Sequence, residues 1–293
     1  MNNNLIKAIW EKNEKRHKLP SRCRNIIISD FEEIKLKIET KDQDYLEELI
    51  DNIYQGDFYI LKNSFSKKFM EDLKEKTFNY FKNKKSEFYK MLEGTPDFHR
   101  LIDLEIGKKY SIKSCKHSFY FYPWNDDPLQ IFDSIYEKWR VLKLLMGLNP
   151  KEYEKNTPKD GVVDRVQVVQ YPSKIGYLEP HLDPHAHQRL IISGYMSKQG
   201  VDYNGLGFYL INKENKILEV EHLIDTGDIG IGSSSVYHGV APVNCEKSPD
   251  WDDINDGRWF LSLFSNASDE VKNRVTSSKT VERFHDKRLH PAI

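Results

Sequence analysis

The sequence predicts an α+β protein in which N-terminal helices flank a double-stranded β-helix, a jelly-roll core made of two β-sheets. Two observations favour this fold. Helical patterns dominate before residue 160, whereas short alternating or β-branched runs separated by Gly, Asn, Asp and Pro dominate after it. Several short strands with frequent turn residues are typical of a sandwich or barrel. We expect one domain: a mainly helical part over 1–160, the jelly-roll core over 161–268, and a helix and tail over 269–293.

The N-terminal part contains two segments with the periodicity of amphipathic helices. Residues 43–54 carry apolar side chains along one helical face, and residues 67–81 repeat Phe and Leu at helical spacing after Ser66, a suitable N-cap. Three further elements are expected: strands over 57–61 and 117–124, and a helix over 128–147 with Pro near its first turn and Gly at its end.

The C-terminal part contains the runs that predict the jelly roll. Turn residues such as Asn204 and Gly205 separate them. The expected strands cover 164–171, 189–197, 207–212, 217–223, 228–232, 236–243 and 259–265.

Composition excludes several classes of protein. The 293 residues include 44 Lys and Arg against 45 Asp and Glu, a formal net charge of −1, which gives no sign of a nucleic-acid partner. No apolar run is long enough to span a bilayer, and the N-terminus lacks the apolar stretch of a secretory signal. The three cysteines are far apart in sequence, which favours a reducing compartment. We therefore expect a cytoplasmic protein.

A pair of potential metal ligands lies early in the expected jelly roll. His181 and Asp183 are two residues apart, so on a strand their side chains point to the same face. His238 is the best candidate for a third ligand, because it follows a turn and a short strand and is flanked by apolar and small residues. Two histidines and one carboxylate form the facial triad of non-haem iron(II) oxygenases, which leaves positions for other ligands.

A lone arginine lies at the start of the last expected strand, directly before the run over 259–265. Arg258 precedes an apolar run, and arginine is rarely buried unless it is paired. Its guanidinium group can bind a carboxylate at two points. If its side chain points inward, Arg258 can therefore hold one end of a dicarboxylate whose other end binds the metal.

Residues 160–266 resemble the iron(II)/2-oxoglutarate dioxygenase superfamily, in its prolyl-hydroxylase-like and phytanoyl-CoA-hydroxylase-like group. The resemblance rests on the ordered set Tyr171, His181-x-Asp183, His238-Gly239-Val240 and Arg258. Because of a polar loop over 245–256, the gap from His238 to Arg258 is longer than in the family.

The resemblance implies a single oxygenase domain that uses iron(II), 2-oxoglutarate and O2. His181, Asp183 and His238 would be the catalytic metal ligands, and Arg258 with Tyr171 or Ser262 would bind the distal carboxylate of 2-oxoglutarate. The expected reaction hydroxylates a C–H bond of a small metabolite or biosynthetic intermediate and releases succinate and CO2. The carboxylate at Asp183 favours hydroxylation over halogenation, while desaturation and ring formation stay open.

Several alternatives remain at this level. His185 and His187 have the same spacing as the first pair and could form an all-histidine site with His238. That arrangement would favour a cupin-like metalloenzyme that does not use 2-oxoglutarate. Arg258 could instead form an ion pair with the loop that carries Asp252 and Asp253. A non-catalytic jelly-roll binding module is the third possibility. The sequence does not predict the oligomeric state.

Overall fold

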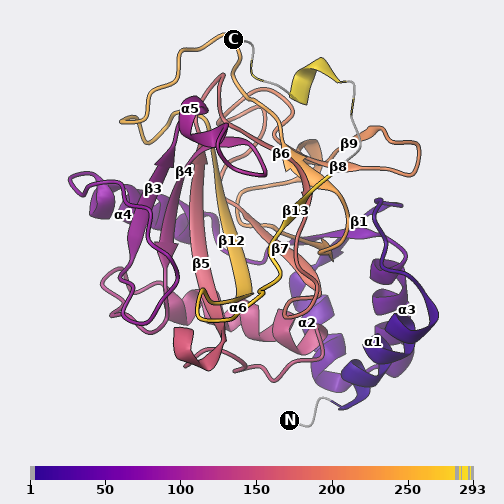
Figure 1. Cartoon of the computed structure of the whole chain (residues 1–293). Helices are drawn as coiled ribbons and strands as arrows, with labels where there is room; N and C mark the ends of the chain where they lie inside the picture. The colour runs from indigo at the N-terminus through magenta and orange to yellow at the C-terminus, as the bar shows by residue number, and fades with distance from the viewer. Residues whose placement is uncertain (1–3, 281–283, 285, 290, 292–293) are drawn as a thin grey trace.

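The computed structural model describes residues 4–280, 284, 286–289 and 291. None of the helices in this part is long and apolar enough to cross a membrane. Figure 1 shows the helices around a strongly curled sheet, with β5 and β12 side by side through its middle. The α-helices are α1 (Asn4–Arg16), α2 (Phe31–Thr40), α3 (Gln43–Tyr54), α4 (Lys67–Phe81), α5 (Leu104–Gly107) and α6 (Phe132–Leu145).

The strands form one hydrogen-bonded series in the order β1-β2-β10-β7-β12-β5-β4-β6-β11-β8-β9, with β3 beside β4 and β13 beside β6. Their bounds are β1 (Ile26–Asp30), β2 (Phe58–Lys62), β3 (Phe98–Ile102), β4 (Ser114–Phe121), β5 (Val162–Tyr171), β6 (Tyr177–Leu182), β7 (Leu190–Tyr195), β8 (Phe208–Ile211), β9 (Ile217–Glu219), β10 (Ile229–Ser233), β11 (His238–Val240), β12 (Arg258–Ala267) and β13 (Ser278–Lys279).

The topology confirms the predicted jelly roll. One sheet contains β10-β7-β12-β5 and the facing sheet contains β6-β11-β8-β9, and from β5 to β8 successive strands alternate between them. β4 pairs with both β5 and β6, so it joins the two sheets along one side. The fold is therefore curled around an interior onto which strands of both sheets project side chains.

Several boundaries follow local chemistry that the sequence made visible. α3 and α4 have the bounds predicted for them, and the hydroxyl of Ser66 accepts a hydrogen bond from the Phe69 N–H at 3.1 Å. α6 instead begins at Phe132, so Pro128 lies outside its first turn. The Asp127 carboxylate accepts hydrogen bonds from the N–H groups of Ile131 and Phe132, and so caps this helix from the preceding loop.

Other expectations at the element level were wrong. The run over 217–223 is a strand only to Glu219 and then becomes a 3-10 turn, η2 (Glu221–Leu223), which exposes His222. Over 269–293, the described residues contain β13 and a short 3-10 helix, η3 (Lys287–Leu289), in place of the expected α-helix. The N-terminal part supplies four strands besides its helices. Two of them, β1 and β3, were not predicted.

The two faces of β5 and β12 serve different purposes. Val166, Val168, Leu261 and Leu263 belong to the large core that also contains buried residues of the helices. The alternate positions point into the jelly roll, because side chains on a strand alternate between faces. This alternation lets the two longest strands pack on helices with one face and line an interior with the other.

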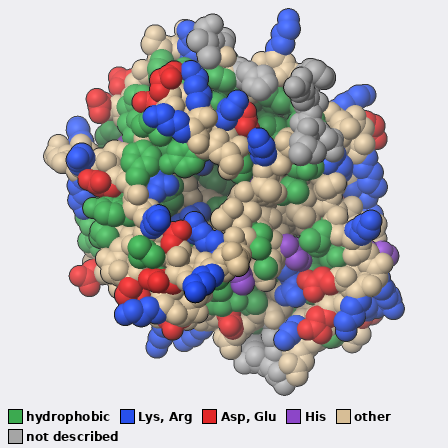
Figure 2. All heavy atoms as spheres, viewed as in Figure 1, with side chains coloured by type: hydrophobic (Ala, Val, Ile, Leu, Met, Phe, Trp, Pro, Cys, Tyr) green, Lys and Arg blue, Asp and Glu red, His purple; other side chains and the backbone are tan. Residues whose placement is uncertain are grey.

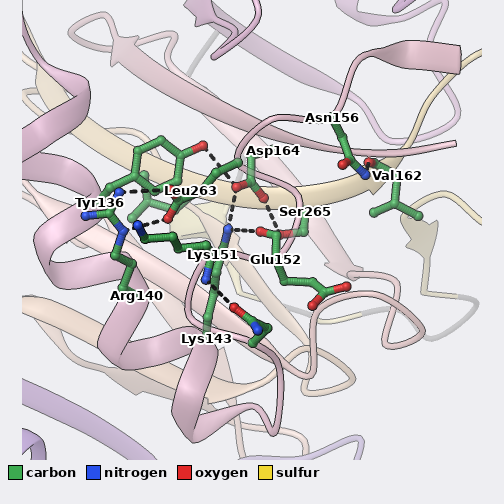
Figure 3. Close-up of polar contacts among 12 residues, drawn as sticks. Tyr136, Arg140, Lys143, Lys151, Glu152, Asn156, Val162, Asp164, Leu263 and Ser265 are labelled. Atoms are coloured by element: carbon green, nitrogen blue, oxygen red, sulfur yellow. Dashed lines mark hydrogen bonds and ion pairs between the residues drawn. The ribbon is translucent and has the colours of Figure 1, made fainter. Parts of the chain in front are cut away.

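A buried polar cluster ties α6 to these two strands (Figure 3). Lys143 of α6 forms an ion pair with Asp164 of β5, and both side chains are fully buried. The same carboxylate accepts hydrogen bonds from the hydroxyls of Tyr136 and Ser265. Lys143 also donates to the backbone carbonyl of Glu152. The buried charges are therefore paired and hydrogen-bonded, as burial of charge requires.

Candidate metal centre

The structure brings His181, Asp183 and His238 together. His181 lies near the end of β6, and Asp183 follows that strand directly. His238 begins β11 and pairs opposite His181 in the antiparallel ladder. One ligand atom from each of the three residues lies within 4.8 Å of the others. Adjacent strands of one sheet thus position the set that the sequence predicted.

Backbone carbonyls fix the orientation of both imidazole rings. Nδ1 of His181 lies 2.9 Å from the carbonyl oxygen of Glu179, and Nδ1 of His238 lies 3.0 Å from that of Val236. A carbonyl oxygen only accepts, so each Nδ1 donates and each neutral ring keeps its lone pair on Nε2. These Nε2 atoms lie 3.7 and 3.5 Å from the two oxygens of Asp183. An ion with ligand distances of about 2 Å can bridge these separations.

The electrostatics keep His181 and Asp183 in the protonation states that a metal needs. The residues His181, Asp183 and His238 are only 5, 8 and 6% exposed. Burial, followed by the neighbouring His238, lowers the pKa of His181 to about 4. Burial raises the pKa of Asp183, but contact with the two histidines and Ser277 outweighs it and leaves the pKa well below its usual range. At neutral pH the site therefore offers a neutral imidazole and a carboxylate.

The rival histidines lie outside this cluster. His185 contacts the Ser234 hydroxyl at 3.3 Å and the Glu14 carboxylate at 3.2 Å. His187 is half-buried and is not part of the three-residue group. Arg189, six residues after Asp183 in the sequence, forms its ion pair with Glu14. The structure thus gives no support to an all-histidine site among the described residues.

The triad opens into a cavity of about 250 Å³ inside the jelly roll. Two residues predicted to contact a co-substrate, Tyr171 and Ser262, line this cavity. Apolar side chains from both sheets, including Phe208 and Phe260, form much of the wall. A small organic ligand can therefore lie beside the metal ligands with part of its surface shielded from water.

Arg258 is placed differently from the prediction. It is buried behind the cavity wall and does not line the cavity. Its Nε donates to Oε1 of Glu221 at 2.6 Å, and its Nη2 lies 2.5 Å from the same oxygen. Arg258 therefore forms an ion pair, as the alternative expected. Its partner is Glu221 of η2 and not the loop with Asp252 and Asp253.

Three cations that sequence reasoning missed do line the cavity: Arg100 of β3, Lys116 of β4 and Arg165 of β5. Burial, together with the charge of Arg165, lowers the pKa of Lys116 to about 8. Strand alternation carried a usable signal for Arg165, because it shares a strand face with Tyr171, and Lys116 shares its face with Tyr120, which also lines the cavity. Figure 2 shows a hollow near the centre of this face of the molecule, with Lys and Arg side chains beside it.

Comparisons with known proteins add similarities at low identity. No protein-family model matches the sequence. A search of curated proteins likewise finds no match. Among solved structures, a full-length Neurospora crassa protein in complex with alpha-KG and thymine is 15% identical, with a TM-score of 0.48 over 83% of this chain and 86% of that one.

Two further structures are similar to the same degree. A Pseudomonas putida prolyl-4-hydroxylase is 13% identical, with a TM-score of 0.44 over 74% of this chain and 95% of its own. JOX2 in complex with 2OG, Fe and JA is 14% identical, with a TM-score of 0.47 over 97% of this chain and 88% of its own. At such values the chemistry of this chain has to be derived from its own residues.

Proposed function

We propose that this protein is an iron(II)- and 2-oxoglutarate-dependent oxygenase that hydroxylates a C–H bond of a small molecule. The observation that carries the proposal is the triad: two imidazoles and one carboxylate, all buried, present their ligand atoms to one another at the edge of an interior cavity. Imidazole and carboxylate ligands in this ratio suit non-haem iron(II) and leave positions for a co-substrate and O2.

Each residue around the cavity has a proposed role in this reaction. His181, Asp183 and His238 would hold the metal, and Ser277 orients Asp183 by donating a hydrogen bond to Oδ1 at 2.6 Å. Bound iron and 2-oxoglutarate would supply the oxidising chemistry, with succinate and CO2 as by-products. Tyr171 and Ser262 lie where they can contact the co-substrate. The apolar wall would exclude water from the reacting C–H bond.

For the distal carboxylate of 2-oxoglutarate we propose Lys116 as the partner. Lys116 lines the cavity, and it is near enough to the triad to lower the pKa of His181. No ion pair or hydrogen bond of its ammonium group is present within the described residues. Arg258, the candidate from the sequence, could act only after release from Glu221, whose negative charge would oppose a second carboxylate nearby.

The test is a titration of 2-oxoglutarate into the iron(II)-loaded protein without oxygen, followed by the weak metal-to-ligand charge-transfer band in the visible region. We expect a band for the wild type and none for Asp183→Ala. Lys116→Ala should raise the half-saturating concentration about tenfold or more, because a charged hydrogen bond is lost. Lys113→Ala, an exposed site on the same segment, is the matched control.

The outcomes separate the alternatives. Loss of the band on Arg258→Met with no effect of Lys116→Ala would return the anchoring role to Arg258. Absence of any band from wild-type protein with iron bound would contradict the use of 2-oxoglutarate. It would favour a metalloenzyme that uses O2 alone, a class consistent with the engagement of Arg258 by Glu221.

A further inference from the structure

The cavity beside the triad contains more positive charge than the proposed co-substrate needs. Arg100, Lys116 and Arg165 line it, and the carboxylate among its lining residues is Asp183, the proposed metal ligand. One cation suffices for the distal carboxylate of 2-oxoglutarate. Whichever cation takes that role, at least two remain without a counter-ion.

The two arginines are held in place but are not neutralised. The guanidinium of Arg165 lies 5.5 Å from the ring of Tyr120 and 5.1 Å from that of Phe264. Arg100 donates one hydrogen bond, from Nη2 to the carbonyl of Tyr89 at 2.9 Å. In both arginines Nε is buried without a hydrogen-bond partner. Neither forms an ion pair with any residue in the described part of the chain.

A second cavity of about 320 Å³ adjoins the first and shares Arg100, Tyr110, Tyr120 and Arg165 with it. The carboxylate in its wall, Asp269, is already engaged. Asp269 forms an ion pair with Arg274 at 2.7 Å and accepts a hydrogen bond from the Met91 N–H at 2.7 Å. Arg100 and Arg165 therefore lie between two cavities and are surrounded by aromatic rings. Their Nε donors form no hydrogen bond with a carboxylate or a carbonyl group.

Leaving such donors unmatched in a partly buried site is costly, and an anionic ligand would satisfy them. We propose that the substrate carries a carboxylate or phosphate group that binds Arg165 and Arg100, with its apolar body lying along the aromatic wall toward the triad. This substrate class rests on the proposed oxygenase function. The anion site itself is a separate property, because it needs no metal.

The test measures binding by calorimetry in full-length protein freed of metal with a chelator. The probes are phenylacetate, phenyl phosphate and the neutral phenylacetamide. At least one acid should bind about tenfold or more tightly than the amide. Arg165→Gln and Arg100→Gln should each remove this preference, whereas Arg140→Gln, whose arginine pairs with Glu154 away from the cavity, should keep it. The acid that binds more tightly, phenylacetate or phenyl phosphate, identifies the anionic group of the substrate.

Arg165→Lys guards against a misfolded variant, because it keeps the charge and should keep part of the preference. Equal binding of acid and amide would overturn the proposal, as would the absence of binding by both acids at millimolar concentration. An acid preference that survives Arg165→Gln and Arg100→Gln would also overturn it. A protein that shows the acid preference but no charge-transfer band would retain the anion site and lose the oxygenase function.

Discussion

Ser277 shows how a residue outside the triad can set its affinity for metal. Its hydroxyl donates to Oδ1 of Asp183 and so fixes the carboxylate relative to both imidazoles. Partners of this kind typically change metal affinity by about 10–100-fold. We expect Ser277→Ala to weaken binding of cobalt(II) by about that factor, as measured by absorption titration. Ser278→Ala, an exposed neighbour in β13, should leave the affinity unchanged. Equal effects of the two variants would contradict this role.

The ionisation of Lys116 makes a second prediction at this scale. Its pKa is lowered to about 8 by burial and by Arg165 and Arg100, while Asp183 opposes the shift. An anion binds the charged form, so affinity for 2-oxoglutarate is full below this pKa and falls as the pH rises through it. We expect the dissociation constant to increase about tenfold between pH 7 and 9. Lys116→Arg should abolish most of that increase, and a pH-independent wild type would contradict the assignment.

The sequence predicted the triad because a two-residue spacing on a strand and a later histidine are local patterns that survive folding. It did not predict the cations, because their meeting depends on the pairing of β3, β4 and β5. The contact predicted for Arg258 differs from the observed one for a related reason. Its partner, Glu221, belongs to a 3-10 turn that is distant in sequence. Spacing within one segment shows which residues share a face, but not what the next strand brings to that face.

At the scale of single elements, hydrogen bonds from capping side chains determine where helices begin. Ser66 accepts a hydrogen bond from the Phe69 N–H and so starts α4. Removal of such a cap costs about 1 kcal/mol. We expect Ser66→Ala to lower the free energy of unfolding in urea by about that amount, and Ser66→Asp to preserve most of it. If Ser66→Asp lowered the free energy of unfolding as much as Ser66→Ala, the Ser66 side chain would act by packing and not by capping.

Elements with strong periodicity, such as α3 and α4, were predicted with the bounds they have. The α6 boundary was missed because Asp127, rather than Pro128, sets its start. β1 and β3 were not predicted, because each gains its stability from a partner strand. Pairing between distant segments, which local periodicity does not encode, determined these elements.

At the scale of the whole molecule, the buried Lys143–Asp164 pair joins the helical layer to the jelly roll (Figure 3). Removing one member leaves the other charge buried without its partner, at a cost of about 3–5 kcal/mol. We expect Lys143→Met to destabilise the protein by that amount in chemical denaturation. The double variant Lys143→Met/Asp164→Leu should recover part of the loss. A double variant as unstable as the single one would contradict this explanation.

The jelly roll itself was predictable because its strands are short, alternating and separated by turn residues. The sequence also indicated N-terminal strands over 57–61 and 117–124, but not their pairing with the core, although β4 is the strand that joins the two sheets and carries Lys116. The N-terminal part therefore contributes to the cavity as well as covering the sheet. The division of the chain at residues 160 and 268 stays a prediction.

The central claim is that His181, Asp183 and His238 hold one metal ion. The most direct measurement is a cobalt(II) titration of the purified chain, followed by its visible absorption. We expect one ion per chain, loss of binding in the alanine variant of each triad residue, and unchanged binding in His185→Ala and His187→Ala. Binding that persists without Asp183, or that disappears with His187→Ala, would contradict the claim.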